Sequence, residues 1–147
     1  MTEAEQRAAI VAEAISFEGT PYHAHGRLKG VGVDCAMFPA LCYESTGFCP
    51  EVNPEYSEQW MHHRDEELYL AEIRKWAREI DREALAPGDL VVWKFGRTYS
   101  HSAIVIDPPL VIHAIIQGGA VIRADMDRDA ELATRPRRYF TVIKAKG

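Results

Sequence analysis

The sequence predicts an α+β domain in which helices come first and an antiparallel sheet follows. Two observations lead to this fold class. The N-terminal half carries apolar residues at helical spacing, and from Pro87 onward short β-branched segments alternate with turn residues. The 147 residues contain no repeat, low-complexity stretch or linker, so a single domain over residues 1–147 is expected.

The first helix is expected over residues 3–17, where Thr2 and Glu5 fit a capping box. Helical spacing aligns one apolar stripe along it: Ala8, Val11, Ala12 and Ile15. A glycine-rich stretch over residues 23–32 follows and lacks the GxxxxGK[ST] spacing of a phosphate-binding loop. We therefore expect it to form a flexible wall that leads to Cys35.

The second helix is expected over residues 35–46 with Asp34 as its N-cap. Pro39 cannot donate a hydrogen bond to the Cys35 carbonyl, so either the first turn is irregular or the regular helix begins later. A third, exposed helix is expected over residues 65–80. Its inward side chains would be Leu68, Ile73, Trp76 and Ile80.

Strands are indicated by short apolar segments rich in β-branched residues and separated by turn signals. The predicted strands are Leu90–Phe95, Ser100–Ile106 and Leu110–Ile116, and Val121–Ala124 and Tyr139–Ile143 would add two more. Together they predict an antiparallel sheet of five to six strands, on which the N-terminal helices pack.

The connection Asp107-Pro108-Pro109 decides how two histidines are arranged. A three-residue connection pairs Ala103 with His113 and places His101 on the same face as His113, as diagonal neighbours about 7–8 Å apart at the backbone. A two-residue turn would send the two rings to opposite faces. We expect the three-residue connection.

Composition excludes several classes of protein. The formal charge of −5 argues against a nucleic-acid-binding protein, and the basic run over residues 135–138 is expected to be a solvated loop. No segment approaches the ~20 apolar residues of a membrane helix, so no membrane insertion is expected. The acidic N-terminus over residues 1–5 does not resemble a signal peptide, so synthesis in the cytoplasm is expected.

The three cysteines leave at least one thiol unpaired, which disfavours a disulfide scaffold. Cys42 is expected in the core and Cys49 in a loop. Zinc is an alternative with four possible histidine ligands: His23, His25, His62 and His63. No CxxC or HxxxH pair occurs, however, so we expect no metal and no cofactor.

Cys35, His101 and His113 occur in the order nucleophile, base and orienting residue of a cysteine hydrolase. A helix N-terminus and a nearby imidazolium would both favour the thiolate. The backbone N–H of Cys35 and the hydroxyl of Tyr22 are candidate oxyanion donors. Each residue alone is more often a core or hydrogen-bonded residue; only their combination favours catalysis.

Five elements then occur in order along residues 19–114: Gly19-Thr20-Pro21-Tyr22, Val33-Asp34-Cys35, Pro87-Gly88-Asp89-Leu90, Ser100-His101 and Ile112-His113-Ala114. They resemble the NlpC family of papain-like cysteine peptidases, which cut bacterial cell-wall peptides. The resemblance implies a papain-like NlpC fold, with a helix that carries Cys35 packed against a sheet that carries His101 and His113. It also implies that Tyr22 aids the oxyanion hole.

The resemblance further implies the substrate, a peptidoglycan stem peptide cut between γ-D-glutamate and a diamino acid. By the same analogy Asp34 and Ser100 would flank the cleft and contact the substrate's ammonium group. Residues 22–27 and the compact length look most like the phage-tail and prophage branch, which implies other phage-tail proteins as partners. The sequence departs from the family at Ala36-Met37, where Ser-Gly is usual, and at Pro39.

Two other functions stay open. The same three residues would serve an amidase or acyltransferase that acts on another acyl donor. Alternatively, the chain is a structural subunit of a phage tail in which these residues are idle.

Overall fold

The computed structural model describes residues 1–49 and 68–144. Its helices are α1 (Glu3–Ser16), α2 (Met37–Ser45) and α4 (Leu68–Ile73), with a 3₁₀ turn η1 (Arg82–Ala84). Its strands are β1 (Arg27–Leu28), β2 (Gly32–Val33), β3 (Arg78–Ile80), β4 (Leu90–Phe95), β5 (Thr98–Asp107), β6 (Leu110–Ile115), β7 (Ala120–Asp125) and β8 (Arg137–Thr141).

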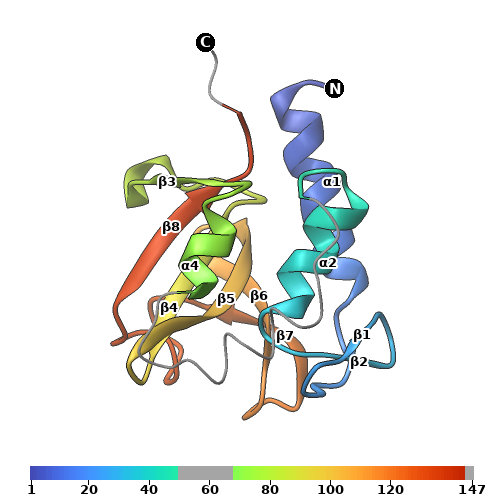
Figure 1. Cartoon of the computed structure of the whole chain (residues 1–147), viewed down its shortest axis with the longest axis vertical. Coiled ribbons are helices and arrows are strands. Elements are labelled where there is room, and N and C mark those ends of the chain that lie inside the picture. Colours follow the sequence, from blue (N-terminus) through green and yellow to red (C-terminus); the bar gives the residue numbers. More distant parts are fainter. Residues whose placement is uncertain (50–67, 145–147) are drawn as a thin grey trace.

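The helices pack on a six-stranded antiparallel sheet with the order β3-β8-β4-β5-β6-β7 (Figure 1). This architecture confirms the predicted α+β fold class. All five strands expected from the sequence are present, with ends shifted by up to two residues. No helix in the described part of the chain is long and apolar enough to span a membrane.

The third predicted helix is wrong in its second half. Helix α4 ends at Ile73, and Arg78–Ile80 form strand β3, which pairs with β8 at the edge of the sheet. Pairing with a distant strand overrides the local helical spacing that the sequence shows. The start of the predicted helix, residues 65–67, lies outside the described residues.

The capping box of α1 is confirmed, because Glu5 N–H donates to Thr2 Oγ1 and Thr2 N–H donates to the Glu5 carboxylate. The predicted stripe, however, is not the face that the core covers: Ile10 and Ala14 are the buried residues of α1. Two neighbouring apolar faces run along this helix, and helical periodicity alone does not choose between them.

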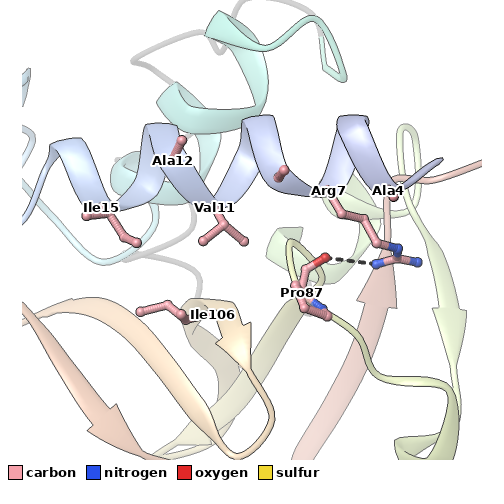
Figure 2. A pocket seen from close by; sticks show the side chains of 8 residues that line it. Ala4, Arg7, Val11, Ala12, Ile15, Pro87 and Ile106 are labelled. Atoms are coloured by element: carbon pink, nitrogen blue, oxygen red, sulfur yellow. Dashed lines mark hydrogen bonds between the residues drawn. The ribbon is translucent and has the colours of Figure 1, made fainter. Parts of the chain in front are cut away.

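The predicted stripe instead lines an open apolar groove of about 530 Å³. Figure 2 shows Val11, Ala12 and Ile15 on one side of this groove and Pro87 and Ile106 on the other. A hydrogen bond from Arg7 to the Pro87 carbonyl bounds the groove at the N-terminal end of α1 (Figure 2).

The glycine-rich stretch over residues 23–32 is more ordered than expected. It contains β1 and the first residue of β2, which form a small antiparallel hairpin. Tyr22 joins this hairpin through a bridge to Val33, and Pro21 bridges to Ala120 on β7. The wall beside Cys35 is therefore attached to the main sheet.

The sheet buries side chains on both faces, so its strands have two cores. The face towards the helices carries Leu90, Val92, Ile104, Ile112, Ala114, Val121 and Phe140, packed with residues of α1 and α2. The other face carries Val91, Trp93, Ala103, Val105 and Val111, covered by Met126 and Leu132 from the segment between β7 and β8. We call these the helix face and the loop face.

The connection between β5 and β6 differs from the prediction. Asp107 pairs with Leu110, so the turn contains two residues, Pro108 and Pro109, and the peptide bond between them is cis. Ile106 is an extra, bulged residue, because Val105 already pairs with Val111. A bulge inserts one residue into the ladder. The bulge thus restores the register that the three-residue connection would have given.

Candidate active site

Cys35 lies just before α2, in a turn capped by the buried Asp34 side chain. Asp34 Oδ1 accepts hydrogen bonds from the amides of Ala36 and Met37 at 3.1 and 2.8 Å. Asp34 therefore caps the turn before α2, but the predicted N-cap position is wrong: the regular helix begins at Met37, two residues later than predicted, and its N-cap residue is Ala36. Within this turn the amides of Cys35 and Ala36 also interact with the thiol and lower its pKa, as expected near a helix N-terminus.

Pro39 has the effect that the sequence predicts. The Cys35 carbonyl receives no amide hydrogen from position 39, and the Ser102 hydroxyl donates to it instead, at 3.1 Å. Ser102 Oγ also lies 2.6 Å from the Tyr69 hydroxyl on α4. Neither Ser102 nor Tyr69 was predicted from the sequence, because no local pattern shows which side chain replaces a helical hydrogen bond.

The Cys35 thiol points at the first residues of β5. Its Sγ donates to the Ser100 carbonyl at 3.6 Å. The ladder between β4 and β5 is irregular here: Trp93 pairs with His101 and Lys94 with Tyr99, which leaves Ser100 without a partner. A bulge redirects backbone groups, and this one presents the Ser100 carbonyl to the thiol.

The electrostatics of the free site favour a neutral thiol. Burial raises the pKa of Cys35 to about 12, the negative charge of Asp34 adds to the increase, and a hydrogen bond from Tyr22 opposes it. The prediction that the thiolate would be favoured is therefore wrong for the free site. The desolvation of a buried thiolate outweighs the donors around it.

His101 and His113 form a hydrogen-bonded pair on the loop face of the sheet. His101 Nε2 lies 2.8 Å from His113 Nδ1, and their ring centroids are 5.0 Å apart. Both side chains are buried, and the rings of Trp93 and Phe95 pack against His101. The predicted same-face arrangement of the two histidines is therefore present, although the turn that was expected to produce it is not.

Both histidines are neutral in the free site. Burial lowers the pKa of His101 well below its usual range, and the charges of His113 and Arg135 lower it further. Burial also lowers the pKa of His113 to about 4, against a small opposing effect of Asp129. Two cations so close together in a dry site would repel each other, which is a further reason for neutrality.

The contact between the rings restricts the tautomers. Because His101 Nε2 faces His113, His101 Nδ1 is the nitrogen left to accept a proton from a thiol. In that tautomer the hydrogen of His101 sits on Nε2 and is donated to His113 Nδ1. His113 then carries its own hydrogen on Nε2, which is buried and has no hydrogen-bond partner among the described residues.

The nucleophile and the base approach each other without a direct hydrogen bond. Within the described residues the thiol bonds to the carbonyl of Ser100, the residue next to His101 in the chain, and not to the His101 ring. The His101 ring lies among loop-face side chains, and the thiol contacts the same strand one residue earlier, at the Ser100 bulge.

Two candidate oxyanion donors lie beside the thiol. The Cys35 amide donates towards the Tyr22 hydroxyl and towards its own thiol, and each contact lowers the pKa of the group that it reaches. Tyr22 is half-buried, hydrogen-bonds to Cys35, and has a raised pKa because of burial and the nearby charges of Cys35 and Asp34. Its hydroxyl therefore keeps its proton at neutral pH and can donate it.

The two predicted substrate contacts differ in accessibility. Asp34 is only 3% exposed, and its second oxygen, Oδ2, accepts the His25 amide at 3.0 Å, so its carboxylate is engaged on both sides. Ser100 is half-buried. No group of three or more acidic, cysteine or histidine residues suited to a metal occurs in the described ranges, which do not include His62 and His63.

Comparison with known proteins gives a consistent result. Residues 19–133 match the profile of the NlpC/P60 family. Among curated protein sequences none matches the chain.

Solved structures provide similar folds. The NlpC/p60 domain of the peptidoglycan hydrolase SagA is 25% identical, with a TM-score of 0.62 over 90% of this chain and 96% of that one. A protein similar to NLP/P60 lipoproteins from Staphylococcus aureus Mu50 is 21% identical, with a TM-score of 0.68 over 98% of this chain and 43% of that one. RipD of Mycobacterium tuberculosis, described as a non-catalytic NlpC/p60 protein adapted to peptidoglycan binding, is 13% identical, with a TM-score of 0.63 over 94% of this chain and 98% of that one.

Proposed function

The chain belongs to the NlpC/P60 family, and we propose that it is a cysteine peptidase that hydrolyses an amide bond in bacterial cell-wall peptides. The observation that carries this proposal is the buried hydrogen-bonded pair of His101 and His113. The Cys35 thiol contacts the carbonyl of Ser100, the residue that directly precedes His101. A thiol, a ring nitrogen free to accept its proton, and a second ring that orients the first are the parts that acyl transfer needs.

In the proposed reaction, Cys35 is the nucleophile. Its thiol proton moves to His101 Nδ1 as the sulfur attacks the amide carbon, and His113 Nδ1 holds the Nε2 hydrogen of His101. The developing oxyanion is stabilised by the Cys35 amide and the Tyr22 hydroxyl. His101 then returns the proton to the leaving amine, and water hydrolyses the thioester that remains on Cys35.

The raised pKa of Cys35 and the lowered pKa of His101 mean that the resting pair is neutral. The proton therefore moves during attack and not before it. The hydrogen-bond donors proposed for the oxyanion are already in place when charge develops on substrate binding. In the free enzyme no permanent thiolate–imidazolium pair has to be desolvated.

The proposed substrate is a peptidoglycan stem peptide, cut between γ-D-glutamate and diaminopimelate or lysine. Support for the cell wall comes from SagA, whose name identifies it as a peptidoglycan hydrolase. Of the two proposed substrate contacts, Ser100 is the more accessible, while Asp34 adds negative charge near the cleft.

Mass spectrometry of purified muropeptides tests this proposal with wild-type protein and Cys35→Ala. We expect cleavage at the γ-D-glutamyl bond by the wild type and at least a 1,000-fold loss in the variant, because the covalent route disappears. Cys49→Ala is the matched control, since the Cys49 thiol bonds to the Ala40 carbonyl of α2 and not to the Ser100 carbonyl. Equal turnover by wild type and Cys35→Ala would contradict the assignment. Transfer of the acyl group to an added amine would indicate the acyltransferase alternative.

A second candidate function is binding to peptidoglycan without turnover. The specific observation in its favour is that the thiol bonds to a backbone carbonyl and has a raised pKa. RipD provides a precedent for a non-catalytic protein of this fold. Sedimentation with cell-wall sacculi, without release of any peptide, would favour this function over the peptidase.

We also propose, from the resemblance of residues 22–27 to the phage-tail branch, that the chain is made in the cytoplasm and assembles with other phage-tail proteins. Proteomic analysis of purified phage or phage-like particles tests this proposal. Absence of the chain from such particles, with the protein present in the cell lysate, would contradict it.

A further inference from the structure

The carbonyl of Cys35 lacks the hydrogen bond that a helix normally supplies. On either side of it the helical pattern is present: Phe38 N–H donates to the Asp34 carbonyl at 3.0 Å, and Ala40 N–H donates to the Ala36 carbonyl at 3.5 Å. The bond between these two would come from residue 39, which is proline. Pro39 thus leaves one carbonyl between these two bonds without its helical donor, and that carbonyl belongs to the proposed nucleophile.

Strand β5 supplies the missing donor. Ser102 Oγ lies 3.1 Å from the Cys35 carbonyl oxygen and 2.6 Å from the Tyr69 hydroxyl. A serine hydroxyl has a single hydrogen, and Ser102 gives it to the carbonyl, so Tyr69 must be the donor in the second bond. Ser102 is fully buried and Tyr69 is 6% exposed, so water does not compete for these bonds.

The peptide unit between Cys35 and Ala36 is consequently held at both ends. Ser102 binds its carbonyl oxygen, and the Asp34 carboxylate accepts its amide hydrogen at 3.1 Å. A peptide unit is planar, so two bonds on opposite sides restrict its rotation. This rotation sets the direction in which Cys35 presents its side chain.

We propose that Ser102, supported by Tyr69, is a positioning residue for the nucleophile, and that Pro39 makes the Cys35 carbonyl available to it. The inference rests on the proposed role of Cys35. Ser102 follows His101 in the chain, so one dipeptide of β5 carries the base on the loop face and holds the nucleophile's backbone on the helix face. The separation between thiol and imidazole is then controlled by covalent geometry as well as by packing.

Loss of the Ser102 hydroxyl would leave the Cys35 carbonyl without a donor near the sulfur. The uncompensated carbonyl disfavours negative charge on the thiolate, and the peptide unit gains freedom to rotate. We expect Ser102→Ala to slow alkylation of Cys35 by iodoacetamide about 3- to 10-fold, the equivalent of one neutral hydrogen bond. The pH profile of alkylation should move to higher pH, and kcat on muropeptides should fall by a similar factor with KM little changed.

Ser45→Ala is the matched control. Ser45 also donates its hydroxyl to a carbonyl of α2, that of Cys42, at 3.1 Å, but at the other end of the helix. Its alkylation rate should equal that of the wild type. Fragment mass spectrometry assigns the alkylated cysteine, and circular dichroism confirms that each variant is folded.

The decisive variant combines Ser102→Ala with Pro39→Ala. An alanine at position 39 restores an amide hydrogen between the two helical bonds that flank it, so the Cys35 carbonyl regains a donor. We expect the double variant to recover the alkylation rate to within about twofold of the wild type, since a backbone hydrogen bond replaces a side-chain one of similar strength. A double variant as slow as Ser102→Ala, or slower, would overturn the inference.

Ser102→Thr provides a second route, because it keeps the hydroxyl. It should react with iodoacetamide at close to the wild-type rate, and a loss equal to that of Ser102→Ala would count against the positioning role. Alkylation needs no cell-wall substrate. If muropeptides are not cleaved but the alkylation pattern holds, the proposed function fails while the positioning of Cys35 by Ser102 stands.

Discussion

The two faces of the central sheet contribute different parts of the candidate site. On the helix face, Ser102 and the turn before α2 hold Cys35 with hydrogen bonds from both sides. On the loop face, the two histidines bond to each other, and His113 Nε2 has no partner in the described part of the chain. The nucleophile is thus positioned by polar contacts alone, and the base by one hydrogen bond to His113 together with aromatic packing against Trp93 and Phe95.

This difference has an electrostatic consequence. The apolar loop face lowers the pKa of both histidines by burial and keeps them neutral, as a proton acceptor must be. The helix face offers amides and a hydroxyl, which stabilise the negative charge that appears on sulfur and oxygen during the proposed reaction. Successive side chains of β5 point to opposite faces of the sheet, so this one strand separates the two environments. The Cys35 thiol contacts the strand at the Ser100 bulge, next to His101.

Among changes that test the difference between the two faces, the largest effect is expected from changes to the histidine pair. His113→Ala leaves His101 Nε2 without a partner in a dry environment, so we expect kcat on muropeptides to fall on the order of 100-fold. His113→Asn keeps an acceptor for the Nε2 hydrogen and should retain more activity than His113→Ala. Equal losses in the two variants, both folded by circular dichroism, would show that the hydrogen bond does not orient the base.

A smaller effect is expected on stability at low pH. The pKa of His113 falls to about 4 on folding, so the unfolded chain binds the extra proton first as pH decreases. Above pH ~6.5 His113 therefore does not reduce the free energy of unfolding. Between pH ~6.5 and ~4 that free energy falls by up to about 3 kcal/mol, because only the unfolded chain takes up the proton.

Urea unfolding at several pH values measures this loss, with His113→Asn as the reference because asparagine does not titrate. The wild type should lose stability more steeply than the variant over this interval. Parallel curves for the two proteins would mean that folding does not change the pKa of His113.

The smallest effect is expected at the rim of the loop face. The Arg135 guanidinium lies 3.8 Å above the Phe95 ring, whose centroid is 4.8 Å from that of His101. Its charge lowers the pKa of His101, after the larger effects of burial and of His113. Removing the charge raises that pKa, so the acidic limb of kcat/KM in Arg135→Gln should move to higher pH by less than about one unit.

Arg135→Lys keeps the charge and should leave the limb in place. Arg128→Gln is a second control, since the Arg128 side chain is 89% exposed. A shift of the same size in both glutamine variants would point to a general effect of net charge.

Much of this arrangement could be predicted because it depends on neighbours in the chain. The capping box of α1, the Asp34 cap and the effect of Pro39 involve residues at most four positions apart, where local geometry decides the outcome. Strand alternation predicted that the two histidines lie on the same face, but it did not predict the turn and the bulge that produce this register. A bulge at Ile106 and a two-residue turn together give the register of a three-residue connection.

Other features were mispredicted or missed because they depend on distant parts of the chain. Residues 78–80 have helical spacing but become an edge strand beside β8. The buried face of α1 is set by its packing on α2 and β5, and the donor for the Cys35 carbonyl lies 67 residues away in the sequence. The predicted direction of the pKa shift of Cys35 was wrong, because desolvation depends on everything that surrounds the sulfur.

The sequence by itself determined the fold class, the capped turn that carries Cys35 and the spacing of His101 and His113 on one face of a hairpin. These follow from side-chain period and from hydrogen bonds between near neighbours. Only the tertiary structure decided that Ser102 replaces the amide that Pro39 lacks, and that burial keeps thiol and imidazoles neutral. Burial and long-range hydrogen bonds exist only once the chain has folded, so no local pattern contains them.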